Sequence, residues 1–253
     1  MTDLNIRLSG KADGKPVILL HALAANLTFW DDFIAAMGPD FRFAAYDQRG
    51  FGASLRPTRE WTVADHVADL ESVRRAVGFD KAALVGTAVG GVIALNYAEL
   101  YPGHVTAVVV TNPTLGAKRA TSLERVLKMK AGGGGMEVIV DEAVARAYGD
   151  LPHDDRYHHY RNEIFLKNDP LGYELTVRGI VEQSIEPILP KIKSPVLVIA
   201  GELDRVTPPD VARHVAGLLP NSRLSILARA SHFSPYQAPA DCAALAGPFL
   251  REF

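Results

Sequence analysis

The sequence predicts an α/β fold with helices on both faces of a mostly parallel, doubly wound sheet. Three observations support this. Short apolar runs, many of them β-branched, alternate with helical patterns along the 253 residues. The runs lack the polar alternation of a half-exposed strand. Hydrophobic residues make up 48% of the chain, enough for a substantial core. The predicted strands cover residues 17–20, 41–46, 82–85, 105–111, 196–200 and 224–227.

Helical patterns fill most of the segments between these strands. Residues 62–77 repeat valine and leucine at helical spacing and stop at Gly78. Residues 92–100 follow the strand at 82–85 after the short segment 86–91, and residues 209–219 begin behind Pro208. The first piece of the chain, residues 4–8, is expected to be an antiparallel edge strand, turned at Asp13 and Gly14.

The alternation breaks between about residues 113 and 185. Charged helical segments surround four glycines at 132–135, and no buried-strand run occurs there. We interpret the glycines as a solvent loop between helices, with a lid hinge as the alternative. We therefore expect a core of residues 1–113 and 186–253 and a helical cap of residues 114–185. A cap after the strand at 105–111 lies above the carboxyl ends of the strands, where ligands bind in open sheets.

Composition indicates which kinds of partner and which cellular compartment to expect. A formal net charge of −2 gives no electrostatic reason to expect nucleic acid or an anionic membrane. The single cysteine fits a reducing compartment, and the N-terminus lacks the layout of a signal peptide. No apolar run approaches the roughly 20 residues of a membrane span. We expect a soluble, cytoplasmic protein, and the sequence leaves its oligomeric state open.

The residue at position 88 is the most informative in the chain. Gly86-Thr87-Ala88-Val89-Gly90-Gly91 lies between a predicted strand and a predicted helix, the context of a nucleophile elbow Gly-x-Ser-x-Gly. Ala88 occupies the nucleophile position, and its methyl group cannot attack a substrate. Either a serine was replaced by engineering, or the protein naturally lacks one. The first interpretation is favoured because a non-glycine residue in the strained elbow costs about 1–3 kcal/mol, which glycine would relieve.

An acid and a base follow two later strands in the order that serine hydrolysis needs. Asp204 ends the loop behind the strand at 196–200, and His232 follows the strand at 224–227. His232 would take the proton of the nucleophile, while Asp204 would fix its tautomer and stabilise the imidazolium. The alternative is an ordinary loop carboxylate and an exposed histidine.

An oxyanion hole needs two backbone N–H donors. We assign one to Val89, directly after position 88, and the other to Leu23, in the loop behind the strand at 17–20. His21 is expected to support that loop. Trp30 is expected either to form a wall of the pocket or to pack in the core.

No metal or cofactor is expected. His158 and His159 are neighbours on a predicted helix and so point about 100° apart. The sequence contains no complete dinucleotide-binding fingerprint and no phosphate loop.

These pieces together resemble the α/β-hydrolase superfamily over nearly the whole chain. Its Asp-x-Arg-Gly-x-Gly-x-Ser turn matches residues 47–54, and its elbow matches residues 86–91 except at Ala88. The resemblance implies the α/β-hydrolase fold with a helical cap inserted after the sixth strand. Within the superfamily the chain is most similar to 3-oxoadipate enol-lactonases, at residues 134–136, 168–173 and 188–192. That similarity implies hydrolysis of a small ester or lactone through an acyl-enzyme, without a cofactor.

The chain departs from the enol-lactonase pattern at a second place besides Ala88. Residues 180–182 read Ile-Val-Glu where that family usually has Ile-Arg-Asp, which removes a natural partner for a substrate carboxylate. Cationic cap residues that can supply the charge instead are Arg125, Lys128, Arg161 and Arg178.

The predicted function is hydrolysis of a small carboxylic ester or lactone by a Ser-His-Asp mechanism, here with the nucleophile removed. The predicted substrate contacts are Trp30, Arg125 and Arg161. The alternatives are a C–C or amide bond hydrolase on the same framework, a cofactor-independent oxygenase, and a binding protein or sensor without turnover.

Overall fold

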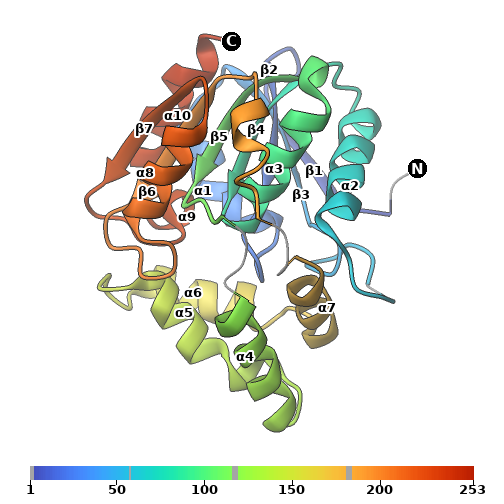
Figure 1. Ribbon diagram of the computed structural model, residues 1–253, viewed down its shortest axis with the longest axis vertical. Coiled ribbons are helices and arrows are strands. Elements are labelled where there is room, and N and C mark those ends of the chain that lie inside the picture. Colours follow the sequence, from blue (N-terminus) through green and yellow to red (C-terminus); the bar gives the residue numbers. More distant parts are fainter. Residues whose placement is uncertain (1–2, 57, 116–118, 181–183) are drawn as a thin grey trace.

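The computed structural model describes residues 3–56, 58–115, 119–180 and 184–253. They form a seven-stranded sheet in the order β1-β3-β2-β4-β5-β6-β7 (Figure 1). β1 runs antiparallel to β3, and every other pair of neighbours is parallel. The prediction of a mostly parallel α/β sheet is confirmed. The strands are β1 (Ile6–Gly10), β2 (Lys15–Leu20), β3 (Phe41–Tyr46), β4 (Ala82–Thr87), β5 (Val105–Thr111), β6 (Val196–Gly201) and β7 (Ser222–Leu227).

The central strands are apolar because both of their faces are covered. Every residue of β4 and β6 is buried, whereas β7, at one edge of the sheet, is only partly so. This is the burial expected of a parallel sheet between two helical layers. The edge strand β1 starts two residues later than predicted, although the carbonyl oxygen of Asn5 still accepts the backbone N–H of Asp47, directly after β3. Asn5 Nδ2 donates to Asp47 Oδ2 over 2.8 Å.

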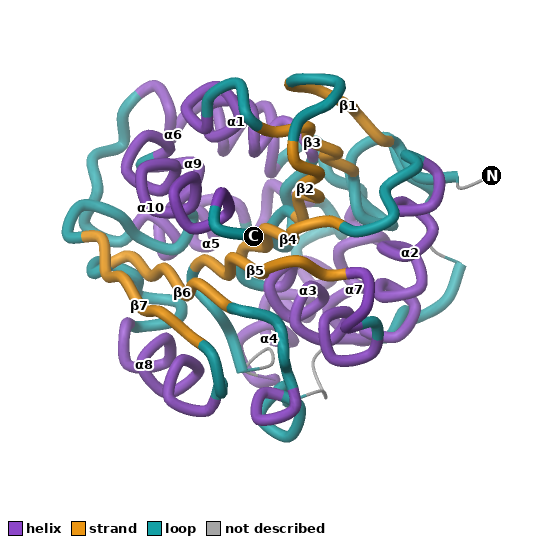
Figure 2. The backbone as a smooth tube through the Cα atoms, turned by 90° about the horizontal axis from the view of Figure 1, so that it is seen from above, coloured by secondary structure: helices purple, strands orange, loops and turns teal. Residues whose placement is uncertain are grey.

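Helices cover both faces of the sheet (Figure 2). One hydrophobic cluster joins α2, α3 and α8 to the sheet, and a second joins α1 and α10 to the opposite face. The predicted helices at 62–77 and 209–219 correspond to α2 and α8, and α3 begins at Val89. The helices of this layered core are α1 (Asp31–Met37), α2 (Val63–Ala76), α3 (Val89–Leu100), α8 (Pro209–Leu218), α9 (Ser234–Gln237) and α10 (Pro239–Arg251), with short turns η1 (Leu27–Trp30), η2 (Pro102–His104) and η5 (Leu189–Lys191).

A group of helices lies at one end of the sheet, between β5 and β6 in the chain (Figure 1). It consists of α4 (Arg119–Ala131), η3 (Met136–Val138), α5 (Val140–Tyr148), α6 (Asp155–His159), η4 (Tyr160–Phe165) and α7 (Pro170–Ile180). The described part of residues 113–185 contains no strand. The insertion follows the predicted strand, residues 105–111. In the described chain this strand, β5, is the fifth and not the sixth, because four strands, β1 to β4, precede it. The four glycines join α4 to η3.

None of the helices formed by the described residues combines the length and the apolar character needed to cross a membrane.

Candidate active site

The chain turns sharply from β4 into α3 at Ala88. Ala88 has φ 50° and ψ −112°, a backbone conformation that is strained for any residue with a side chain. The glycines around it allow the turn. A Cβ on Gly86 would lie 2.4 Å from the carbonyl oxygen of Gly90, and one on Gly90 would lie 2.2 Å from that of Leu20. The turn therefore has the geometry of a nucleophile elbow, with a methyl group at its tip.

His232 and Asp204 come from the loops behind β7 and β6. Because these strands are parallel neighbours, their carboxyl ends lie at the same edge of the sheet. His232 Nδ1 lies 2.9 Å from Asp204 Oδ2, and both side chains are buried. With Nδ1 bonded to the carboxylate, Nε2 is the ring nitrogen left for proton transfer. His232 and Ala88 line the same cavity.

Asp204 is held as a carboxylate by several donors. Its Oδ1 accepts the backbone N–H groups of Val206 and Thr207, at 2.7 and 2.9 Å. Its Oδ2 accepts from His232, and also from the Thr207 hydroxyl and Asn112 Nδ2, each at 2.9 Å. Burial by itself would raise the pKa of Asp204, but the charge and hydrogen bond of His232, together with the hydrogen bonds of Thr207, lower it overall.

Asn112 connects the acid loop to the histidine loop, and the sequence analysis did not find it. It follows β5 and has φ 49°, in the left-handed region that asparagine tolerates better than most residues. Its Nδ2 donates to Asp204 Oδ2 and to the carbonyl oxygen of Ser231, both at 2.9 Å. Its Oδ1 accepts the hydroxyl of Ser234. The available signal was a polar residue directly after a buried strand, at the edge where Asp204 and His232 were predicted.

The backbone nitrogens of Leu23 and Val89 are available as donors. Both residues line the cavity next to Ala88. Val89 is the first residue of α3, where N–H groups have no partner within the helix and the helix dipole favours negative charge. In the described part of the chain neither nitrogen is engaged in a hydrogen bond. These are the two positions assigned to the oxyanion hole from the sequence.

His21 supports the loop that carries Leu23. It is fully buried, and burial lowers its pKa, so the ring is neutral. His21 Nδ1 lies 2.7 Å from the carbonyl oxygen of Ala22, and Nε2 accepts the backbone N–H of Gln48 over 2.9 Å. His21 is not among the described residues that line the cavity, so its role is to hold the loop.

The cavity has a volume of about 310 Å³, at the lower end of the range for small-molecule sites. Its wall is mostly apolar and comes from the core and from the inserted helices α4, α5 and α7. Its lining residues include Ala88, Arg125, Arg146, Tyr173 and His232.

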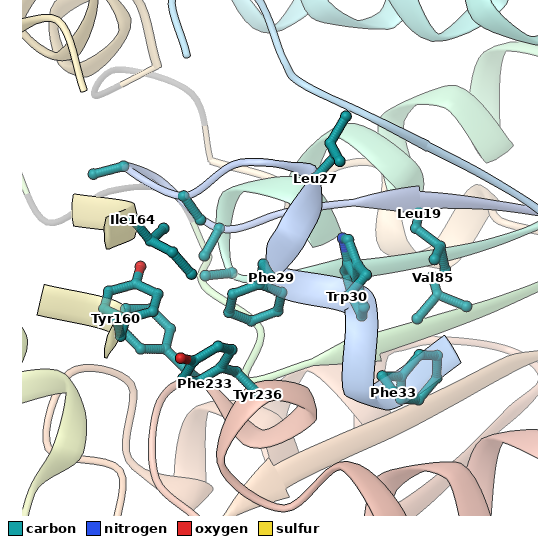
Figure 3. Packing of buried hydrophobic residues seen from close by; sticks show 14 of the residues in the cluster. Leu19, Leu27, Phe29, Trp30, Phe33, Val85, Tyr160, Ile164, Phe233 and Tyr236 are labelled. Carbon is teal, nitrogen blue, oxygen red and sulfur yellow. The ribbon is translucent and has the colours of Figure 1, made fainter. Parts of the chain in front are cut away.

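Of the three predicted substrate contacts, Arg125 lines the cavity, and Trp30 and Arg161 do not. The prediction for Trp30 was wrong, because the indole is fully buried against Phe29 and Phe33 at the end of η1 (Figure 3). The prediction for Arg161 was also wrong. Its side chain is bonded to Asp141, Nε to Oδ1 over 2.7 Å, away from the cavity wall.

Two other cationic candidates are paired elsewhere. Lys128 Nζ lies 2.7 Å from Glu142, and Arg178 Nε lies 2.9 Å from Glu174. An aromatic residue that the sequence analysis did not single out, Phe233, lines the cavity next to His232.

The fold corresponds to that of known proteins. The family model of the alpha/beta hydrolase fold matches residues 15–132. The crystal structure of the enol-lactonase from Burkholderia xenovorans superposes with a TM-score of 0.93 at 24% identity, covering 99% of this chain and 97% of that one. A thermophilic esterase from Thermogutta terrifontis gives 0.89 at 23% identity, covering 98% and 93%. The chain therefore has the α/β-hydrolase fold.

The chain is also similar in sequence to several curated hydrolases. The chain is 26% identical to 3-oxoadipate enol-lactonase 2 of Acinetobacter baylyi, over 93% of its length and 88% of the relative. It is 27% identical to a 2-hydroxy-6-oxo-6-(2'-aminophenyl)hexa-2,4-dienoic acid hydrolase of Metapseudomonas resinovorans, over 94% and 84%. It is 29% identical to a putative carbamate hydrolase of a Caulobacter species, over 90% and 87%. The predicted resemblance to enol-lactonases and related hydrolases is confirmed.

Proposed function

We propose that this site hydrolyses small carboxylic esters or lactones when a serine occupies position 88, and that the chain with Ala88 is a serine-to-alanine variant that binds the substrate without consuming it. One observation carries the proposal: His232, which is hydrogen-bonded to Asp204, lines the same cavity as Ala88, beside the two free N–H groups of Leu23 and Val89. Simple binding does not require an acid-base pair, an oxyanion hole and a strained turn together.

The mechanism follows the positions of these groups. His232 Nε2 takes the proton of the serine hydroxyl as the oxygen attacks the substrate carbonyl, and Asp204 stabilises the imidazolium. The N–H groups of Leu23 and Val89 stabilise the negative oxygen of the tetrahedral intermediate. The imidazolium protonates the leaving alkoxide, and an acyl-enzyme remains. A water molecule, deprotonated by His232, then releases the acid and restores the serine.

The chain with Ala88 lacks only the attacking atom. Replacing Oγ by hydrogen leaves the cavity, the base and the two N–H donors in position, so substrate binding is expected to persist. The conformation at position 88 supports the interpretation as a substituted serine. A turn with no nucleophile to present could use glycine and avoid about 1–3 kcal/mol of backbone strain.

The testing experiment is Ala88→Ser, assayed with a panel of aryl esters, lactones, vinylogous ketones and amides. In a serine protease, loss of the nucleophile costs about 10⁶-fold in kcat, so we expect an increase on the order of 10⁵ to 10⁶ for the best ester or lactone. The control is the same substitution combined with His232→Asn, which lacks the base and should remain inactive.

The panel also distinguishes the alternatives. Preferential cleavage of the vinylogous ketones or of the amides would favour a C–C or amide bond hydrolase. The names of the Metapseudomonas and Caulobacter relatives justify including both classes. If the serine variant cleaves nothing in the panel while the Ala88 protein binds ligands, the protein is a binding protein or sensor.

A further inference from the structure

The charges around the cavity are all of one sign. Arg125 on α4 and Arg146 on α5 line it, and the described lining residues include no aspartate or glutamate. The rest of the wall is predominantly apolar, so an anion in the cavity interacts with the largely buried Arg125 more strongly than it would in water. A cavity of this kind attracts an anion.

Arg125 is the more buried of the two arginines and is incompletely paired. Its side chain is 13% exposed, and its Nε and Nη2 atoms are buried without a hydrogen-bond partner in the described structure. The nearest carboxylate oxygen, Oε1 of Glu142, is 3.6 Å from Nε, beyond hydrogen-bond distance. The other oxygen of Glu142 is bonded to Lys128 over 2.7 Å. Buried N–H groups of a cation are costly to leave unbonded, so this site is incomplete without a ligand.

Tyr173 and Arg146 add to the same site. Tyr173 on α7 lines the cavity close to Arg125. Burial raises the pKa of Tyr173 while the charge of Arg125 opposes the rise, so the hydroxyl keeps its proton and can donate. Arg146 is exposed, and in the described structure it forms no ion pair with a protein carboxylate. Its charge is therefore free to attract an anion toward the cavity.

We propose that the ligand of this cavity carries a carboxylate that binds to Arg125, with Tyr173 as a second donor and Arg146 as an attracting charge. The substrate class is then an ester or lactone with a free carboxylate. The guanidinium presents N–H groups in a planar fork that matches the two oxygens of a carboxylate. Arg125 thus determines specificity for the anionic group, at a distance from the bond that is broken. The identity of the substrate as an ester or lactone rests on the proposed function, whereas the preference for a carboxylate does not.

The test measures binding to the protein with Ala88, so that no turnover interferes. Monomethyl glutarate, which has an ester and a free carboxylate, is compared with the neutral dimethyl glutarate by calorimetric titration at pH 7.5. We expect the half-ester to bind at least tenfold more tightly. In Arg125→Gln this preference should disappear, and in Arg125→Lys it should be reduced but retained. The matched control is Arg161→Gln, which removes a cap arginine bonded to Asp141 outside the cavity and should leave both affinities unchanged.

Thermal unfolding separates a binding role of Arg125 from a structural one. Arg125→Gln removes a buried, incompletely paired cation, so its Tm should equal or exceed that of the parent. A structural role would lower the Tm and weaken both ligands equally. Inorganic phosphate is the third probe, and competition by phosphate at the concentration of the half-ester would show a general anion site instead of a carboxylate site. Equal binding of the two esters, or an unchanged preference in Arg125→Gln, overturns the proposal.

The outcome is independent of the proposed hydrolysis. If the half-ester is preferred but Ala88→Ser hydrolyses nothing, the carboxylate site stands and the hydrolase proposal fails. If Ala88→Ser hydrolyses the half-ester and the diester with equal kcat/KM, the hydrolase proposal stands and the carboxylate site fails.

Discussion

Replacing Asp204 by asparagine tests whether the carboxylate organises the site. An asparagine side chain has one accepting oxygen and one donating NH₂ group. If the NH₂ takes the place of Oδ2, it meets the donating amide of Asn112 and the Nδ1 atom of His232. If it takes the place of Oδ1, it meets the backbone N–H groups of Val206 and Thr207, which cannot reorient. Neither orientation satisfies the donors around it.

The expected loss of stability follows from these bonds. A hydrogen bond to a charged group contributes about 1.5–3 kcal/mol, and a buried donor left unsatisfied costs a similar amount. At least one such bond is lost in either orientation, so we expect Asp204→Asn to lower the free energy of unfolding by about 3 kcal/mol. For a chain of this size, that corresponds to a fall in Tm of roughly 6–12 °C.

The assay is urea unfolding followed by circular dichroism at pH 7.5. Asp150→Asn is the matched control, because Asp150 forms an exposed ion pair with Arg205 and its loss should cost at most about 1 kcal/mol. In the Ala88→Ser background, Asp204→Asn should also lower kcat by about 10⁴-fold, since His232 then carries its proton on Nε2 and cannot act as the base. A variant as stable and as active as its parent would refute the assignment of Asp204.

The stability difference should depend on pH in a defined direction. The pKa of Asp204 in the folded protein is lowered from its ordinary value of 3.8. A carboxyl group whose pKa is lower in the folded protein than in the unfolded chain stabilises the folded state. This contribution is complete above the pKa of the unfolded chain and is lost as the pH falls through the pKa of the folded protein. The gap between Asp204→Asn and the parent should therefore be constant above about pH 5 and narrow below pH 3.8. A gap that widens in acid would contradict this linkage.

Three further predictions concern the scaffold, each measured by urea unfolding. Gly90→Ala should destabilise the protein by more than about 3 kcal/mol because the new Cβ meets a backbone carbonyl. Its control, Gly217→Ala in α8, has open space around the new Cβ and should stabilise the protein by about 0.5–1 kcal/mol. Equal effects of the two substitutions would refute the packing argument. Burial lowers the pKa of His66 to about 3, so the parent loses stability as the pH falls from 7.5 to 5. In His66→Gln this loss should be smaller by about 2 kcal/mol, and an unchanged pH dependence would count against the role of His66. Glu71→Gln should cost about 3 kcal/mol because it leaves the buried Arg74 without its carboxylate, and a loss below 1 kcal/mol would show that the pair is effectively solvated.

Much of the fold and of the candidate site was predictable because it depends on local chemistry and on chain order. A strand covered on both faces must be apolar throughout, so β4, β5 and β6 were recognisable as runs. Only glycine fits where backbones meet, which marked the turn around Ala88 through Gly86 and Gly90. Asp204 and His232 were predicted to be neighbours because the carboxyl ends of consecutive parallel strands meet at one edge of the sheet.

Packing between distant segments decided the rest. Asn112 and Thr207 were not predicted, because their hydrogen bonds to Asp204 depend on how the loops behind β5 and β6 lie against each other. Helical spacing shows that α4 has faces, but it does not show which face covers the cavity. Arg125 therefore could not be distinguished from Arg161 until the inserted helices were placed on the core.

The sequence by itself determined the order of strands and helices along the chain, the glycines of the sharp turn, and the residues proposed as the acid, the base and the occupant of the nucleophile position. The tertiary structure alone decided which side chains surround the ligand, because burial in the cavity depends on contacts between elements far apart in the chain. The same reason explains Trp30, whose large apolar side chain suits a pocket wall and a core equally well. Its contacts with Phe29 and Phe33 assign it to the core.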